Sequence, residues 1–186
     1  MKKEFIKLSG ILCAITLVAA MLLAGVNHIT APKIKEAEEQ ATAEAMKKIL
    51  PIAESFEKMN DNVFMGIKAG EPVGFCVSVA ENGYGGPIEM MVAIDSDAKV
   101  CGIEILSHSE TAGLGAKATE PEFKNQFSGK NPTLEVVKAK TESPDQITAI
   151  TGATITSRAV ASGVDKAYDM LLEAIEKEEK ESAENN

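Results

Sequence analysis

The chain begins with an apolar run that differs from the rest of the sequence. Residues 8–26 are 19 consecutive residues without a charge. A helix of about 20 apolar residues is long enough to cross the hydrocarbon core of a membrane, so the run predicts an N-terminal transmembrane anchor. A cleaved signal peptide is the alternative, because the basic stretch "MKKEFIK" opens the chain. The apolar region of a signal peptide is normally only about 7–15 residues, and the greater length here favours an uncleaved anchor.

Two different periodicities follow the apolar run. Residues 32–50 are rich in Lys, Glu and Ala with apolar positions at helical spacing, which predicts a stalk helix that Pro51 ends. Beyond Pro51 the pattern changes to strand-like segments with short connections, which indicates an antiparallel meander. Strands are predicted at residues 63–68, 73–80, 88–95, 99–106, 134–139 and 146–150, with a short helix at 119–127.

The last predicted element is a helix over residues 157–178. Its apolar stripe, which includes Val160, Val164 and Leu171, is expected to pack on one face of the sheet. The order of elements gives an α+β fold in which an antiparallel sheet and packed helices follow a single transmembrane helix. The expected domains are an anchor at 1–31, a stalk at 32–51, a folded domain at 52–178 and a charged tail at 179–186.

Charge and cysteine content exclude several kinds of site. The chain has 28 acidic and 19 basic residues, and Arg158 is its only arginine, so we expect no nucleic-acid partner. Cys13 lies in the apolar run, and Cys76 and Cys101 lie in predicted strands without a metal-ligand spacing, so no metal site is expected. Packing in the core is favoured over a disulfide for the last two.

Three loops hold more glycines and hydroxyls than core formation requires. They are "NGYGGP" at residues 82–87, "SHSETAGLGAK" at 107–117 and "AITGATITSRAV" at 149–160. Each loop alone is typical of a turn or a helix cap, since Gly, Asn, Ser and Thr favour such positions. The third loop carries four hydroxyl residues, more than one helix start needs for capping.

Two of these loops carry a resemblance to a known family. "SHSETAGLG", followed some forty residues later by "TGATITS" behind a single apolar span, resembles the FMN-binding subunits of the Rnf complex (its G subunit) and of the sodium-pumping NADH:quinone reductase (its C subunit). The form "TGATITSRAV" is closer to the Rnf G subunit. In this family a flavin transferase esterifies the phosphate of FMN to the last threonine of the [ST]-G-A-T motif. That residue is Thr154 here.

The resemblance implies a set of residues that bind FMN. A phosphate just before a helix meets unpaired N–H groups and the positive end of the helix dipole, and Gly152 and Ala153 leave the approach to Thr154 narrow. Tyr84 would stack on the flavin ring or be a buried aromatic at a turn, and His108 would tune the flavin or be a surface residue. The implied site is Thr154, Thr151, Gly152, Ala153 and Thr156 in one loop, Glu110, Thr111, Gly113, Leu114 and Gly115 in the second, and Tyr84 and Gly85 in the third.

The chain departs from the family pattern at two positions. Ala112 stands where a proline is usual in the second loop, which removes one fixed φ angle. Thr148 stands where the flavin-transferase motif usually has an aspartate, and the nearest aspartate is Asp145. The second departure concerns covalent attachment and not the pocket itself.

The expected function is that of a membrane-anchored flavoprotein subunit of an Rnf-type complex. It would pass electrons through FMN, with the other subunits and the flavin transferase as partners, and would not be an enzyme alone. The chain lacks a cysteine set for an iron–sulfur cluster and a G-x-G-x-x-G fingerprint, so ferredoxin and NAD would be handled by other subunits. The amino terminus is expected in the cytoplasm and the FMN domain outside. The alternatives are a cofactor-free anchored binding module and a stand-alone extracytoplasmic reductase or sensor.

Overall fold

The computed structural model describes residues 2–184, so Met1 of the expected anchor and Asn185 and Asn186 of the expected tail lie outside the described residues. The chain divides into two compact units between Ala41 and Thr42, and each is described by itself.

The first unit is formed by α1, which begins at Lys2 and continues to Ile49, so that its last turns belong to the second unit. The helix is long and apolar enough to cross a membrane, and its apolar side chains from Leu8 to Val26 are exposed. The sequence predicts an anchor followed by a separate stalk helix. The structure has one continuous helix with Pro32 inside it, which ends just before Pro51 as expected.

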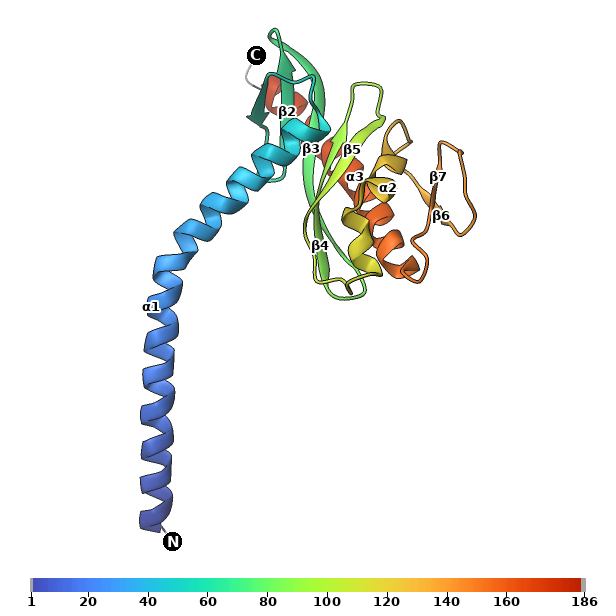
Figure 1. The fold of residues 1–186 in the computed structure, drawn as a ribbon. Coiled ribbons are helices and arrows are strands. Elements are labelled where there is room, and N and C mark those ends of the chain that lie inside the picture. Colours follow the sequence, from blue (N-terminus) through green and yellow to red (C-terminus); the bar gives the residue numbers. More distant parts are fainter. Residues whose placement is uncertain (1, 185–186) are drawn as a thin grey trace. The chain divides into compact units, whose positions relative to one another are not determined.

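The second unit is built on a five-stranded antiparallel sheet (Figure 1). The strands follow one another in space in chain order, which confirms the predicted meander. The first four of the six predicted strands are present in this sheet. A further short strand precedes them, because the segment after Pro51 pairs with the next strand. The strands are β1 (Ser55–Lys58), β2 (Val63–Lys68), β3 (Glu71–Asn82), β4 (Pro87–Ile94) and β5 (Val100–Ser107).

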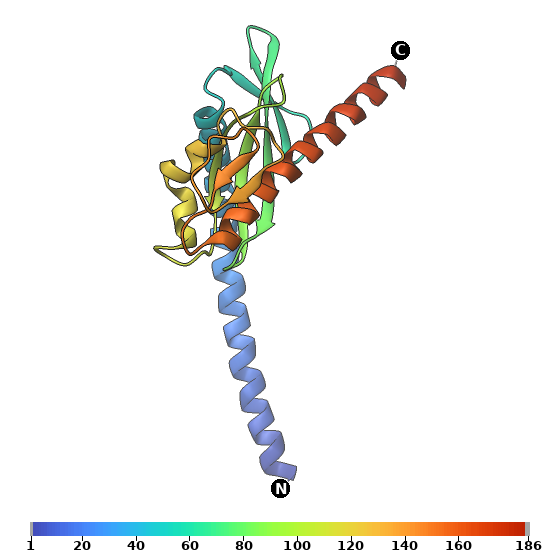
Figure 2. The same ribbon diagram turned by 90° about the vertical axis from the view of Figure 1, so that its right-hand side faces the viewer.

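One face of the sheet is covered by α3 (Thr154–Glu184), as the apolar stripe predicted. Val160 and Val164 of the helix are fully buried in one cluster with Val77 of β3 and Val92 of β4. The α+β fold class is confirmed. The helix is longer than predicted at both ends, and Figure 2 shows its last turns extending beyond the sheet.

The opposite face of the sheet is covered by the last turns of α1. Ala45, Met46, Ile49 and Leu50 form a second buried cluster with side chains of β3 and β4, including Met91. Strand β4, which lies between β3 and β5, is therefore buried on both faces, and five consecutive residues from Met90 to Ile94 are all buried. A run of this kind is typical of a strand enclosed between two layers.

The two cysteines of the sheet are free thiols within the second cluster. Cys76 of β3 is buried, and its burial, with a smaller effect of nearby Cys101, raises the pKa of the thiol to about 12. Cys101 lies on β5, with β4 between the two strands. The packing interpretation of both residues is confirmed.

Short elements close the β5 edge of the sheet. Backbone hydrogen bonds join Val100 to Lys130 (3.0 Å) and Gly129 to Val100 (2.7 Å), so β5 is partly covered. At the other edge, β1 presents exposed Glu57 and Lys58. The elements between β5 and α3 are η1 (Gly115–Thr119), α2 (Pro121–Lys124), η2 (Asn125–Phe127) and the parallel pair β6 (Glu135–Val137) and β7 (Gln146–Thr148).

A compact ion-pair network joins the end of α1, β5 and α2. Both oxygens of Glu104 accept hydrogen bonds from the ammonium of Lys124 at 2.8 Å, and one oxygen lies 2.9 Å from Nζ of Lys48. Burial by itself would raise the pKa of Glu104, but the hydrogen bonds and charges of the two lysines hold that pKa below its usual value. The side chains of Lys124 and Glu104 are only 10% and 18% exposed, so loss of either charge leaves its partner poorly solvated.

We expect Glu104→Gln to lower the free energy of unfolding by about 2 kcal/mol, because the amide removes the charge that both lysines meet. The lowered pKa of Glu104 means that its stabilisation is present above pH 4.5 and is lost as the pH falls through the lowered value. Chemical unfolding of the full chain in mild detergent measures both effects. Glu57→Gln on the exposed edge strand is the control, and equal stability of the two variants would contradict the prediction.

Residues 42–51 are expected to be part of the folded domain's core. A chain that begins at Ile52 loses Met46, Ile49 and Leu50, each of which stabilises the fold by about 1.5–3 kcal/mol through burial. We expect it to unfold at a clearly lower urea concentration than a chain that begins at Thr42. Equal midpoints for the two soluble chains would show that the second cluster contributes little.

Candidate functional site

The three loops singled out in the sequence converge at one end of the sheet. In the antiparallel register Asn82 pairs with Pro87, and Glu89 at the start of β4 pairs with Ser107 at the end of β5. The β3–β4 turn and the loop after β5 therefore leave the sheet at the same end. The start of α3 reaches the same place, because Thr156 contacts Glu110 in the second loop.

The approach to α3 is a tight turn over residues 150–153. The N–H of Ala153 donates to the carbonyl of Ile150 at 2.9 Å, and Gly152 has a φ of +80°, which favours glycine. A Cβ on Gly152 would also lie 3.1 Å from the side chain of Leu114. The turn places Thr154 as the first residue of a 31-residue helix.

The four hydroxyl residues of this stretch have different environments. Thr151 is exposed and Thr154 is half-buried. Thr156 and Ser157 are buried, and their hydroxyls bind other parts of the protein. The hydroxyl of Ser157 donates to the carbonyl of Ala153 (3.0 Å) and accepts from the N–H of Ile150 (2.9 Å), so it holds the turn onto the helix.

Glu110 is the residue on which the three loops meet. Its Oε1 accepts a hydrogen bond from the N–H of Gly85 at 2.9 Å, and its Oε2 accepts one from the hydroxyl of Thr156 at 2.6 Å. The residue is only 9% exposed. Its own N–H donates to Nδ1 of half-buried His108 at 3.1 Å, which fixes the backbone of the loop.

The carboxylate of Glu110 is held in its ionised form. Burial by itself would raise its pKa, but hydrogen bonds from the hydroxyl of Thr156 and the backbone of Gly85 and Tyr84 outweigh that effect. The resulting pKa lies below the usual value of a glutamate. The hydrogen bond to Thr156 is accordingly short, as charge-assisted bonds are.

Three glycines surround this carboxylate because no larger residue fits. A Cβ on Gly83 would lie 2.3 Å from Oε1 of Glu110, and a Cβ on Gly115 would lie 2.3 Å from Oε2 and 2.7 Å from the hydroxyl oxygen of Thr156. A Cβ on Gly85 would lie 2.1 Å from the carbonyl oxygen of Ser109. The loops therefore approach one another at backbone distance.

Exposed apolar side chains lie on the same three loops. Tyr84 is 72% exposed, Leu114 is 43% exposed and Ile155 is 56% exposed. The alternative that Tyr84 is a buried aromatic is therefore wrong. Ile155 was not predicted as a site residue, although its position between two hydroxyl residues at a helix start was visible in the sequence. Large exposed apolar side chains on loops that converge offer a surface for a ligand or a partner.

The second loop is shaped by a turn at Thr111. Its carbonyl accepts hydrogen bonds from the N–H groups of Leu114 (3.1 Å) and Ala116 (3.2 Å). Gly113 has a φ of +77° and is exposed. The turn forms with Ala112 in place of the usual proline, so the missing ring does not prevent this backbone arrangement.

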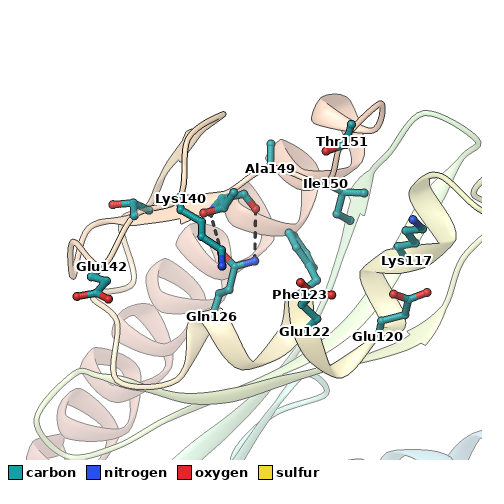
Figure 3. A pocket seen from close by; sticks show the side chains of 12 residues that line it. Lys117, Glu120, Glu122, Phe123, Gln126, Lys140, Glu142, Ala149, Ile150 and Thr151 are labelled. Carbon is teal, nitrogen blue, oxygen red and sulfur yellow. Dashed lines mark hydrogen bonds between the residues drawn. The ribbon is translucent and has the colours of Figure 1, made fainter.

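A cavity of about 790 Å³ adjoins the turn before α3 (Figure 3). Figure 3 shows Phe123 and Gln126 directed toward the segment that carries Ala149 and Ile150. The side-chain amide of Gln126 makes two hydrogen bonds to the backbone of Thr148. It accepts one from the N–H at 2.8 Å and donates one to the carbonyl at 3.4 Å. The cavity includes Thr151 but none of the second-loop residues from Glu110 to Gly115.

The site fits the phosphate of a flavin nucleotide by its donors and its space. The first N–H groups of a helix have no partner within that helix, so the start of α3 offers donors and a positive dipole end beside Thr154. Gly152 adds no side chain to the turn before Thr154, and the side chain of Leu114 lies next to this turn. The start of α3 therefore suits a bound phosphate group.

Comparison with known families gives two matches within the chain. The model of an FMN-binding domain matches residues 83–169, which include the second and third loops of the site and all but the first residue of the first loop. The model of the RnfG N-terminal region matches residues 1–49, which correspond to α1.

The described residues contain no group of three or more His, Cys, Asp or Glu side chains able to hold a metal ion.

Relatives with similarity along the chain share one description. The G subunit of the proton-translocating ferredoxin:NAD(+) oxidoreductase complex of Clostridium ljungdahlii is 36% identical, over 83% of this chain and 84% of that protein. The G subunit of the Na(+)-translocating complex of Acetobacterium woodii is 37% identical, over 88% and 89%. The G subunit of the ion-translocating oxidoreductase complex of Methanosarcina acetivorans is 34% identical, over 91% and 95%.

A solved structure is similar in fold to more than half of the chain. The crystal structure of NqrC from Shewanella oneidensis superposes with a TM-score of 0.51 at 24% identity, over 57% of this chain and 54% of that chain. Sequence, domain match and fold agree with the resemblance seen in the loops. The chain therefore belongs to the RnfG family, the G subunits of ion-translocating oxidoreductase complexes, and contains their FMN-binding domain.

Proposed function

We propose that this chain is a membrane-anchored electron-transfer subunit that carries FMN within an ion-translocating ferredoxin:NAD oxidoreductase complex. Its relatives are named as G subunits of such complexes and match it along most of their length. The other subunits of the complex are its partners, and it is not an enzyme alone. When bound, FMN supplies one- and two-electron redox chemistry, while the protein sets the position and the electrostatics of the flavin.

We further propose that FMN is attached through a phosphoester to Thr154 by a flavin transferase. The observation that carries this proposal is the placement of Thr154 as the first residue of α3 with a half-buried side chain. An anion bound there gains from the helix dipole and from N–H groups that lack helical partners. Thr151 is exposed at the turn before the helix, and Thr156 donates its hydroxyl to Glu110.

The exposed apolar side chains around Thr154 provide the surface for the flavin ring. Leu114 reaches to the turn at Gly152, and Tyr84 and Ile155 are more exposed than most large apolar residues of a folded domain. An isoalloxazine ring covers such side chains well because it is flat and its dimethylbenzene part is apolar. The backbone of Thr111 to Gly115 lines this side of the site.

The orientation and the domain limits belong to the same proposal. Residues 1–31 anchor the chain, 32–51 form the stalk, 52–178 form the FMN-binding domain and 179–186 form a charged tail. The last turns of the stalk also pack against the sheet of the FMN-binding domain. The basic residues before the apolar run keep the amino terminus in the cytoplasm, and a large domain is translocated whatever its charge. The FMN-binding domain then lies on the extracytoplasmic side.

We expect Thr154→Ala to abolish covalent flavin while the fold stays intact. Loss of one hydroxyl at a helix start costs about 0.5–2 kcal/mol at most, which a folded domain tolerates. The measurement is flavin fluorescence after denaturing electrophoresis of protein produced with a flavin transferase. Intact mass of the wild type should show one added FMN less one water.

Two variants serve as controls for this experiment. Thr154→Ser keeps a hydroxyl at the same position and should retain covalent flavin. Thr119→Ala removes an exposed hydroxyl that bonds only the carbonyl of Ala116 in its own turn and should retain it fully. Flavin that stays on Thr154→Ala protein through denaturation would show that the attachment site is elsewhere.

The proposed orientation predicts that protease added to cells stripped of their outer layers removes the domain from Pro32 onward. Immunoblotting of the membrane fraction should then show loss of the full-length chain without lysis. A cytoplasmic protein, probed in parallel, must stay intact. Digestion only after lysis would place the domain on the cytoplasmic side.

A further inference from the structure

We propose that Glu110 is a positioning residue that fixes the rotation of the first turn of α3 and thereby presents Thr154 to the flavin. This inference rests on the proposed attachment of FMN to Thr154. It differs from the expectation drawn from the family resemblance, in which Glu110 is part of the surface that binds the cofactor.

The carboxylate of Glu110 points into the protein. Both of its oxygens are occupied by groups of the protein, Oε1 by the N–H of Gly85 at 2.9 Å and Oε2 by the hydroxyl of Thr156 at 2.6 Å. The residue is buried, whereas neighbouring Thr111 is exposed. A carboxylate that points inward and is bonded at both oxygens acts on the protein rather than on a ligand.

The geometry of the helix links Thr156 to Thr154. Successive residues of an α-helix are rotated by about 100°, so Thr154 and Thr156 lie about 200° apart around the axis of α3. A bond that draws Thr156 inward therefore turns Thr154 outward. The exposures agree with this geometry, because Thr156 is 1% exposed and Thr154 is half-buried.

The space around the carboxylate leaves it little freedom. Gly83 and Gly115 line it so closely that a Cβ on either residue would lie 2.3 Å from a carboxylate oxygen. The loops therefore hold the side chain of Glu110 in place from two sides. In return, Glu110 joins the β3–β4 turn, the loop after β5 and the start of α3, so one side chain sets the relative positions of all three.

The other buried hydroxyl of the same helix turn has a different role. Ser157 binds only groups of its own segment, the carbonyl of Ala153 and the N–H of Ile150. These two bonds shape the turn before α3, but they do not set the rotation of the helix relative to the sheet. The bond from Thr156 to Glu110 spans 46 positions of the chain and ties this turn to the second loop.

The test compares hydrogen exchange and flavin transfer in the same variants of the full chain. Hydrogen exchange is measured in detergent on protein made without flavin transferase, in peptides that cover residues 83–86 and 150–157. We expect Glu110→Ala and Thr156→Val to accelerate exchange there by about tenfold or more, because each removes a charge-assisted hydrogen bond. Exchange in the core strand β4 should not change.

The same variants are then exposed to flavin transferase, and the initial rate of covalent flavin incorporation is measured. Glu110→Ala and Thr156→Val should each slow incorporation by about tenfold. The double variant should be no slower than Glu110→Ala alone, because Glu110→Ala already removes the bond to Thr156. Thr156→Ser keeps the hydroxyl and should restore the rate. In Glu110→Gln the amide oxygen can accept a hydrogen bond from Gly85 or from Thr156, but the side chain lacks the charge. Its rate of flavin incorporation should therefore lie between the rates of the wild type and of Glu110→Ala.

The matched control is Glu89→Ala, which removes an exposed carboxylate from β4, close in sequence to the first loop. It should change neither exchange nor flavin incorporation. If Glu110→Ala does not fold, Thr156→Val and Glu110→Gln carry the test, because both keep the size of the side chain.

The outcomes separate this inference from the proposed function. Slower flavin incorporation with unchanged exchange would show that Glu110 contacts the flavin directly, and would overturn the positioning role. Unchanged exchange and unchanged incorporation in Glu110→Ala would overturn it as well. If no chain, including the wild type, takes up covalent flavin, the proposed attachment to Thr154 fails. Accelerated hydrogen exchange in the variants would still establish that Glu110 and Thr156 hold the loops together.

Discussion

Burial of the sheet on both faces is the constraint on which the second unit depends. Strand β4 lies at the centre of this arrangement, with α3 packed on one face and the last turns of α1 on the other. Because both faces are closed, the loops at the ends of the sheet are the parts of this unit that stay free to form a site. One end carries the β3–β4 turn, the loop after β5 and the start of α3, and this end holds the site.

Much of this architecture follows from local patterns in the sequence. The four longer strands were predicted because their apolar residues occur in short runs between turn residues, and α3 because its stripe repeats at helical spacing. β1 was missed because it has four residues and only Phe56 is partly buried, so its pairing with β2 decides its structure. Continuity of α1 through Pro32 was missed because a proline is usually read as a helix boundary.

The site was predictable in its membership but not in its internal contacts. The motifs identified Glu110 and Thr156, but the bond between them joins residues 46 positions apart and depends on how three loops leave the sheet. The glycines are a similar case. Gly83, Gly85 and Gly115 read as turn formers, yet positive φ angles occur instead at neighbouring Gly86 and Gly113. The first three are needed for space, and only the folded structure shows what fills it.

The two edges of the sheet differ in a way that governs association between chains. An open edge offers unpaired backbone groups that can bind another strand, and proteins protect such edges by keeping them short and charged. The loop at Gly129 and Lys130 caps β5, while β1 has only four residues and carries exposed Glu57 and Lys58. Tethered copies of this chain would be concentrated in the plane of a membrane, where edge-to-edge pairing is favoured by proximity. The short, charged β1 and the capped β5 work against such aggregation and keep the loop end of the sheet as the surface for specific recognition.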